Sequence, residues 1–197
     1  MSQVAERPLR ADARRNRERV IAAARAVFAE QGREAQMDDV ARRAEVGVGT
    51  VYRHFPTKEA LLRAVAEDAF ARISADAAAA LEMDDPWEAF VHIVEVGAQV
   101  MAGDRALTEV AMELPGGIRA VAGAQDELRE RVEKIVRRAQ EAGMLRADLV
   151  ADDIGMLMCG IGSATKKEHR CPEAWRRHLS IVIDGLRASS ATSKLPD

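Results

Sequence analysis

Residues 47–58 have the sequence GVGTVYRHFPTK and follow DVARRA at residues 39–44. This pattern predicts two short helices joined by a tight turn at residues 45–47. Pro56 ends the second helix, because proline disfavours helical geometry in the residue before it. The arrangement suits the major groove of DNA better than it suits catalysis, since a short second helix enters the groove while the first braces it.

The second of these helices, expected at residues 48–54, is predicted to have a buried face and an exposed polar face. We expect Val51 and Phe55 to pack inward. The general pattern also occurs in proteins that bind no DNA, so it does not decide the function by itself. The side chains expected to meet phosphates or base edges are Thr50, Tyr52, Arg53 and His54.

Lys58 stands in the first turn of the next helix, after Thr57, which is a good N-cap residue. The helix dipole disfavours a cation at this position. A phosphate bound jointly by the helix N-terminus and the ammonium group would compensate. The alternative is a lysine that is merely solvated at the surface.

Charge is unevenly distributed along the chain. Residues 1–60 contain 12 Lys and Arg and 9 Asp and Glu, a net of +3, and the remainder contains 17 and 23, a net of −6. The asymmetry fits a local contact with a polyanion, although chance fluctuation produces the same pattern. An N-terminal arginine arm precedes and opens the first helix, where it would follow a minor groove. For Arg7 and Arg10 the alternative is a disordered charged tail. The residues of the arm are Arg7, Arg10, Arg14, Arg15, Arg17 and Arg19.

The composition predicts an all-α fold, because strong helix formers dominate and only 4% of residues are aromatic. No apolar stretch approaches the ~20 residues that span a bilayer, and the N-terminus lacks the apolar segment of a secretory signal. The two cysteines predict no disulfide framework, so a cytoplasmic location is expected. We expect no cofactor.

Apolar periodicity and capping signals predict nine or ten helices. Asp85 and Pro86 are expected to begin one of them. We expect a DNA-binding domain at residues 1–57, a second helical domain at 58–188 and a flexible tail at 189–197. The helices are expected at about 13–31, 37–44, 48–54, 58–81, 86–103, 104–113, 118–121, 125–142, 152–166 and 172–188.

Three groups of residues share the spacing of one known family. They are FAExG at residues 28–32, DVAxxAxV at 39–46 and GTVYxHFPTKEAL at 49–61. Together they resemble the N-terminal domain of the TetR-type, tetracycline-repressor-like transcriptional regulators. The resemblance covers about residues 14–62, and the combined spacing is highly specific.

The resemblance implies a three-helix helix-turn-helix domain followed by a helical ligand-binding and dimerisation domain. It implies a homodimer on a palindromic double-stranded operator, most often a repressor released by a small-molecule effector. Thr50, Tyr52 and His54 would contact the DNA backbone or brace the recognition helix, and Lys58 would contact a phosphate. The residues to consider for base recognition are Arg42, Gly49 and Arg53.

Two residues depart from the family pattern. Glu45 stands where the family usually has glycine, and a non-glycine residue there has a left-handed backbone cost. The connection from Gly32 to Val40 is one residue shorter than in many members, so Gln36 is not expected to replace the common threonine in its N-cap contact. We therefore expect the turn and the start of the helix at residue 37 to differ from the family pattern.

The rest of the chain is longer than a DNA-binding unit requires. Large soft side chains suit an adaptable effector pocket, although such residues at helical spacing are more often plain core. His92, Glu95 and Gln99 share one helix face and either orient a polar ligand or belong to an ordinary surface or hydrogen-bond network. The candidate pocket residues are Phe70, Trp87, Phe90, Val94, Met101, Met112 and Met156.

Two other function classes fit the sequence less well. An enzyme needs a nucleophile–base pair or a metal cluster, and the scattered histidines give neither. A helical adaptor that binds only protein leaves the arginine arm and Lys58 unexplained. We expect a DNA-binding homodimer that forms through the last two long helices, about 152–166 and 172–188, with no metal and no membrane contact.

Overall fold

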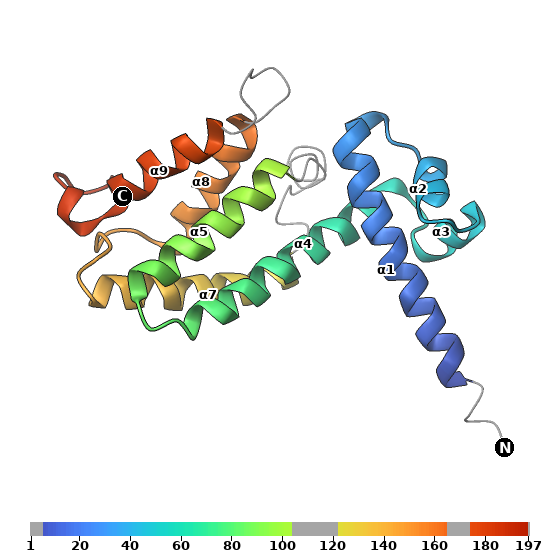
Figure 1. Ribbon diagram of the computed structural model, residues 1–197, viewed down its shortest axis with the longest axis horizontal. Helices are drawn as coiled ribbons and strands as arrows, with labels where there is room; N and C mark the ends of the chain where they lie inside the picture. The colour runs from blue at the N-terminus through green and yellow to red at the C-terminus, as the bar shows by residue number, and fades with distance from the viewer. Residues whose placement is uncertain (1–5, 104–121, 165–173, 197) are drawn as a thin grey trace. The chain divides into compact units, whose positions relative to one another are not determined.

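The computed structural model describes residues 6–103, 122–164 and 174–196, which form eight α-helices and two short 3-10 helices (Figure 1). The all-α prediction is confirmed, and the expected helices at about 104–113 and 118–121 lie outside the described residues. In chain order the elements are α1 (Glu6–Gln31), η1 (Gly32–Glu34), α2 (Met37–Arg43), α3 (Val48–His54), α4 (Lys58–Leu81), α5 (Pro86–Gly103), α7 (Ala122–Glu141), α8 (Ala151–Ala164), α9 (Ala174–Leu186) and η3 (Ala188–Ser190).

The described residues divide into two compact units. The first ends at Asp68, and the second begins at Ala69, so the division falls inside α4. The sequence placed a domain boundary earlier, between residues 57 and 58. That position is where α4 begins, and the first eleven residues of this helix belong to the first unit.

The core of the first unit is the apolar stripe of α1 packed with α2, α3 and the start of α4. Each of the five stripe residues that the sequence predicted is at most 4% exposed. Ala41 and Ala44 are both 4% exposed, and their small size allows the helices to approach closely. The stripe residues are Val20, Ile21, Ala24, Val27 and Phe28.

Two N-caps fix the starts of α4 and α5 as the sequence predicted. Thr57 Oγ1 accepts a hydrogen bond from the backbone N–H of Ala60 at 3.1 Å. Asp85 Oδ1 accepts from the backbone N–H groups of Trp87, at 2.7 Å, and Glu88, at 3.0 Å. Both side chains satisfy donors that the first helical turn leaves without a backbone partner.

The second unit is built around α5, which packs against α7, α8 and α9 (Figure 1). A Cβ atom placed on Gly97 would lie 3.2 Å from Met158 Sδ, so glycine permits the close approach of α5 and α8. One arginine of α7 satisfies carbonyl groups at the end of α4 and just after it. Arg138 donates to Leu81 O at 2.7 Å and to Met83 O at 2.8 Å.

The chain beyond α9 differs from the expected flexible tail. Arg146 donates to Ser193 O at 2.8 Å, and the backbone N–H of Leu195 donates to Asp148 Oδ2 at 2.8 Å. Arg146 Nε also donates to Asp148 Oδ1 at 2.6 Å. The tail is thus bound to the segment between α7 and α8 by hydrogen bonds to residues almost fifty positions away.

Candidate nucleic-acid interface

Helix α3 has the buried and exposed faces that its sequence predicts. Val51 is fully buried and Phe55 is 3% exposed, whereas Tyr52 is 48% exposed. Gly49 and Arg53 are exposed beside Tyr52. A Cβ atom on Gly49 would meet no atom within 4 Å, so this part of α3 is open to a large partner.

The exposed face also includes Val48, which the sequence pattern did not indicate. Val48 is the first residue of α3 and is 42% exposed. The available signal was its position as the first residue of α3, next to the exposed Gly49, where no preceding helical turn covers it. Thr50 and His54 were expected on this face, but both are half-buried. His54 lies beside the Phe55 ring, with 6.2 Å between the ring centres.

The turn between α2 and α3 is left-handed at Glu45, which has a φ of 53°. The backbone N–H of Val46 donates to Ala41 O at 3.1 Å, and that of Glu45 donates to Arg42 O at 3.2 Å. These two bonds form a Schellman motif, which satisfies carbonyl groups at the end of a helix. Glu45 thus has the left-handed conformation whose cost the sequence indicated.

Gln36, the residue before α2, makes two hydrogen bonds with nearby residues at the start of this helix. Asp39 Oδ2 accepts from the backbone N–H of Gln36 at 3.3 Å, while the Gln36 side chain donates to Glu34 O at 2.9 Å. Asp39 also accepts a hydrogen bond from Arg42 at 3.1 Å. The exposed Arg42 guanidinium is therefore held beside a carboxylate, and a contact with DNA would compete with that ion pair.

Lys58 begins α4, as the sequence predicts, and its side chain is half-buried. Its Nζ atom lies 5.8 Å from the centre of the Phe28 ring. The expectation of an uncompensated cation at this helix N-terminus therefore needs correction, because a ring face attracts an ammonium group. The next residue is Glu59. Its carboxylate accepts hydrogen bonds from the Glu59 backbone N–H and from the Thr57 side chain, and these bonds lower the pKa of Glu59.

The N-terminal arginines lie on a helix rather than on an irregular arm. Arg7 and Arg10 fall within α1, which begins at Glu6. Arg14 is exposed and forms an ion pair with Glu18 at 3.5 Å. Arg17 places its guanidinium 5.5 Å from the centre of the Phe55 ring, so it packs within the domain.

Comparison with known proteins agrees with this geometry. Residues 20–65 match the family described as bacterial regulatory proteins, tetR family. Residues 85–188, more than half of the chain, match the C-terminal domain of SbtR-like transcriptional regulators. The chain belongs to the TetR family of bacterial regulatory proteins.

Solved TetR-family structures resemble most of the chain. A TetR transcription regulatory protein from Mycobacterium vanbaalenii is 38% identical, with a TM-score of 0.67 over 91% of this chain and 99% of that one. The regulator SCO0520 from Streptomyces coelicolor is 28% identical, with a TM-score of 0.64 over 87% and 98%. The TetR fold therefore extends over both units.

Curated TetR-family relatives match over shorter stretches. The repressor KstR of Mycolicibacterium smegmatis is 39% identical over 98 residues, 49% of this chain and 48% of that protein. KstR of Mycobacterium tuberculosis is 45% identical over 74 residues, 36% of this chain and 34% of that protein. This chain thus matches half or less of these repressors' length.

The candidate pocket residues that the structure describes are not brought together around one cavity. Met101 and Phe70 are 6% and 8% exposed, and Phe90 and Val94 are at most 1% exposed, as expected of core. Met156 is 74% exposed on α8, so it does not line an interior cavity of the protomer. Met112 lies outside the described residues.

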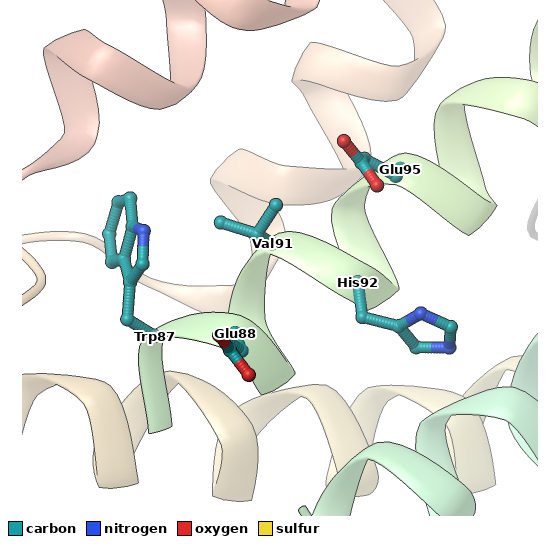
Figure 2. A pocket seen from close by; sticks show the side chains of 5 residues that line it. All are labelled: Trp87, Glu88, Val91, His92 and Glu95. Carbon is teal, nitrogen blue, oxygen red and sulfur yellow. The ribbon is translucent and has the colours of Figure 1, made fainter. Parts of the chain in front are cut away.

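An open hollow of about 230 Å³ does lie along α5 (Figure 2). Trp87 contributes to it, and Arg187 covers that ring, with 4.2 Å from the guanidinium carbon to the ring centre. The hollow is smaller than a typical ligand pocket, and residues of a single helix line it. These residues are Trp87, Glu88, Val91, His92 and Glu95.

Other reactive groups give no second site among the described residues. No three His, Cys, Asp or Glu side chains in that part of the chain are placed to bind a metal ion. Burial raises the pKa of the Cys159 thiol, which disfavours the reactive thiolate. None of the described helices is long and apolar enough to cross a membrane.

Proposed function

We propose that this protein represses transcription by binding a palindromic operator as a homodimer, and that a small molecule releases it. The observation that supports this best is the exposed face of α3, formed by Val48, Gly49, Tyr52 and Arg53 on a helix that Val51 and Phe55 hold in place. The curated TetR-family relatives are named repressors. In such a role the protein acts in the cytoplasm and catalyses no reaction.

The charge distribution supports DNA rather than a protein as the partner of α3. The net charge of +3 in residues 1–60 contrasts with −6 in the remainder. Backbone phosphates attract such a basic region, and side chains on the exposed helix face then select the bases. Tyr52 and Lys58 are the contacts we assign to the DNA backbone, and we assign Arg53 and Gly49 to the approach of the bases.

The outer surfaces of α8 and α9 support a homodimer. Met156 on α8 is 74% exposed and Ile181 on α9 is 62% exposed. Gly155 and Gly160 of α8 and Gly185 of α9 have open space where a side chain would stand, which leaves room for a helix of a second copy. A two-fold four-helix interface through α8 and α9 would place two α3 helices about 34–36 Å apart, one DNA turn.

The effector is assigned to the second unit, which the C-terminal TetR-family domain covers. Helix α4 has residues in both units, so a ligand that favours one position of α4 changes the position of α3. A coupling of only about 1–3 kcal/mol would change operator affinity about 5- to 150-fold. The hollow at Trp87 is too open to enclose such a ligand in the described state.

Selection of binding sites from random DNA duplexes tests this proposal directly. The purified full chain is expected to enrich one palindromic sequence, and an effector screen on that duplex is expected to find molecules that release it. Retention of random-sequence DNA at low salt but not at high salt would indicate phosphate contacts alone. Failure to retain any duplex at low salt would favour the helical adaptor that binds only protein.

A further inference from the structure

The α2–α3 turn includes a residue with a strained backbone, Glu45, and a side chain of α1 binds this turn. Glu45 adopts a φ of 53°, in the left-handed region that disfavours side chains with a Cβ atom. Glu45 is also an acidic residue, 86% exposed at its side chain, directly before the helix that faces DNA. The conformation has a cost in stability, and the carboxylate repels DNA phosphates.

Arg19 of α1 contacts both parts of this turn. Its Nη2 atom donates to Ala44 O at 2.7 Å and lies 3.6 Å from Glu45 Oε2. Ala44 O lies at the end of α2, where carbonyl groups have no partner within the helix. The guanidinium thus binds a terminal carbonyl and the carboxylate of the strained residue next to it.

Helix α1 also contacts the other end of α3. Arg17, two residues before Arg19, places its guanidinium 5.5 Å from the centre of the Phe55 ring. Helix α3 is only seven residues long, so the contacts at its two ends determine its orientation. Arg19 is the contact at the end where the backbone is strained.

We propose that Arg19 is a positioning residue for α3, which acts by holding Ala44 O and the Glu45 carboxylate together, and is not a ligand of DNA phosphate. This inference rests on the proposed DNA binding and adds a requirement for sequence preference. A residue that orients α3 determines operator recognition, whereas a phosphate ligand contributes equally to every DNA sequence. The two roles therefore give opposite results in a comparison of duplexes.

The first experiment measures the affinity of Arg19→Ala for the selected operator and for a random duplex over a range of salt concentrations. We expect affinity for the operator to fall about tenfold, as for one charge-assisted hydrogen bond, with little change on the random duplex and an unchanged salt slope. Equal reductions on both duplexes, with a salt slope smaller by about one, would show a phosphate ligand and overturn the proposal.

Arg43→Ala is the matched control. Its side chain is 49% exposed, against 50% for Arg19, and it also links α2 to α1, through Glu30 at 2.9 Å, without contacting the α2–α3 turn. We expect Arg43→Ala to leave the ratio of the two affinities unchanged. If it lowers the ratio as much as Arg19→Ala does, general loosening of the domain explains the effect and the proposal is wrong.

The second experiment repeats Arg19→Ala in a Glu45→Gly background, because glycine adopts the left-handed turn without strain. We expect the reduction in operator affinity to shrink from about tenfold to about threefold, since only the bond to Ala44 O is then removed. An undiminished reduction contradicts coupling through Glu45. The urea stabilities of the wild type, Arg19→Ala, Glu45→Gly and the double variant are compared without DNA. A failure of DNA binding is then distinguishable from a failure of the Arg19 contact.

Discussion

The Nζ atom of Lys58 lies 5.8 Å from the centre of the Phe28 ring, so the first residue of α4 contacts a buried residue of α1. Phe28 is 1% exposed, and its ring is therefore fixed in the core. The contact limits the positions that the ammonium group adopts. A positioned ammonium at a helix N-terminus is well suited to bind a phosphate.

Replacement of Lys58 by alanine is expected to weaken binding to all duplexes, because the ammonium group would no longer bind a phosphate. The slope of log affinity against log salt concentration should become shallower by about one for each phosphate that the variant leaves unbound. Salt titrations by fluorescence anisotropy measure this slope. Lys134→Ala, which removes an exposed lysine of α7, should leave the slope unchanged. An unaltered slope in Lys58→Ala would count against the phosphate contact.

A double variant, Met156→Asp with Ile181→Asp, is expected to dissociate the dimer while the helical content stays the same. Two apolar side chains that we assign to the interface would become charged in each copy, which should raise the dimer dissociation constant roughly 100-fold or more. Sedimentation velocity measures the change. Val48→Asp alters another exposed apolar residue, on α3, and should remain dimeric. A double variant that also stays dimeric would place the interface elsewhere.

Thr57→Ala is expected to destabilise the protein by about 1 kcal/mol, because Ala60 N–H loses its acceptor at the start of α4. Thr57→Ser retains the hydroxyl group, so its destabilisation should be only a few tenths of that of Thr57→Ala. Urea unfolding followed by circular dichroism measures both variants. Equal destabilisation by serine and alanine would show that the methyl group, and not the cap, matters.

The pH dependence of stability should reveal the Arg146–Asp148 pair. The Arg146 guanidinium, with the backbone N–H of Leu195, holds the pKa of Asp148 well below its ordinary value. A lowered folded-state pKa stabilises the fold above the unfolded pKa of about 3.9, and this stabilisation is lost as the pH falls below that value.

Asp148→Asn removes that titration. The variant should be less stable than the wild type at pH 6, and the difference should narrow steadily as the pH falls from 5 towards 2. Urea midpoints at a series of pH values measure this difference in stability. The other carboxylates are the same in both proteins, so their contributions cancel in the difference. Parallel curves for the two proteins would mean that the pair does not contribute.

Local signals in the sequence were sufficient to predict the helix-turn-helix. Pro56 and Thr57 end one helix and begin the next within two residues, and residues 48–54 form a helix as expected. Glu45 was expected to be left-handed because it stands where the related proteins have glycine, and its φ is 53°. Each of these signals acts over four residues or fewer.

Contacts between distant residues could not be predicted in this way. The start of α1 has no apolar stripe, so apolar periodicity placed the beginning of this helix at about residue 13, whereas it begins at Glu6. Arg19 was grouped with the arginines that precede and open the first helix, but its partner Ala44 is 25 residues away. Arg146 and Asp148 bind the chain after α9 through Ser193 and Leu195. These contacts produce no periodic pattern of residues in the sequence that could have predicted them.

The effector pocket was the least predictable feature for a different reason. Phe90 and Met156 are both large apolar residues at helical spacing, yet one is fully buried and the other is 74% exposed. Apolar periodicity identifies the face of a helix that avoids water. It does not distinguish a packed core, an effector cavity and an interface between copies.

The most direct test of DNA recognition by α3 compares the selected operator with a shuffled duplex of the same composition at one salt concentration. We expect the wild type to bind the operator at least about 10³-fold more tightly. Tyr52→Ala should reduce affinity while the dimer persists, because Tyr52 is 48% exposed on α3. Equal wild-type affinity for the two duplexes, or full operator affinity in Tyr52→Ala, would contradict recognition through this face of α3.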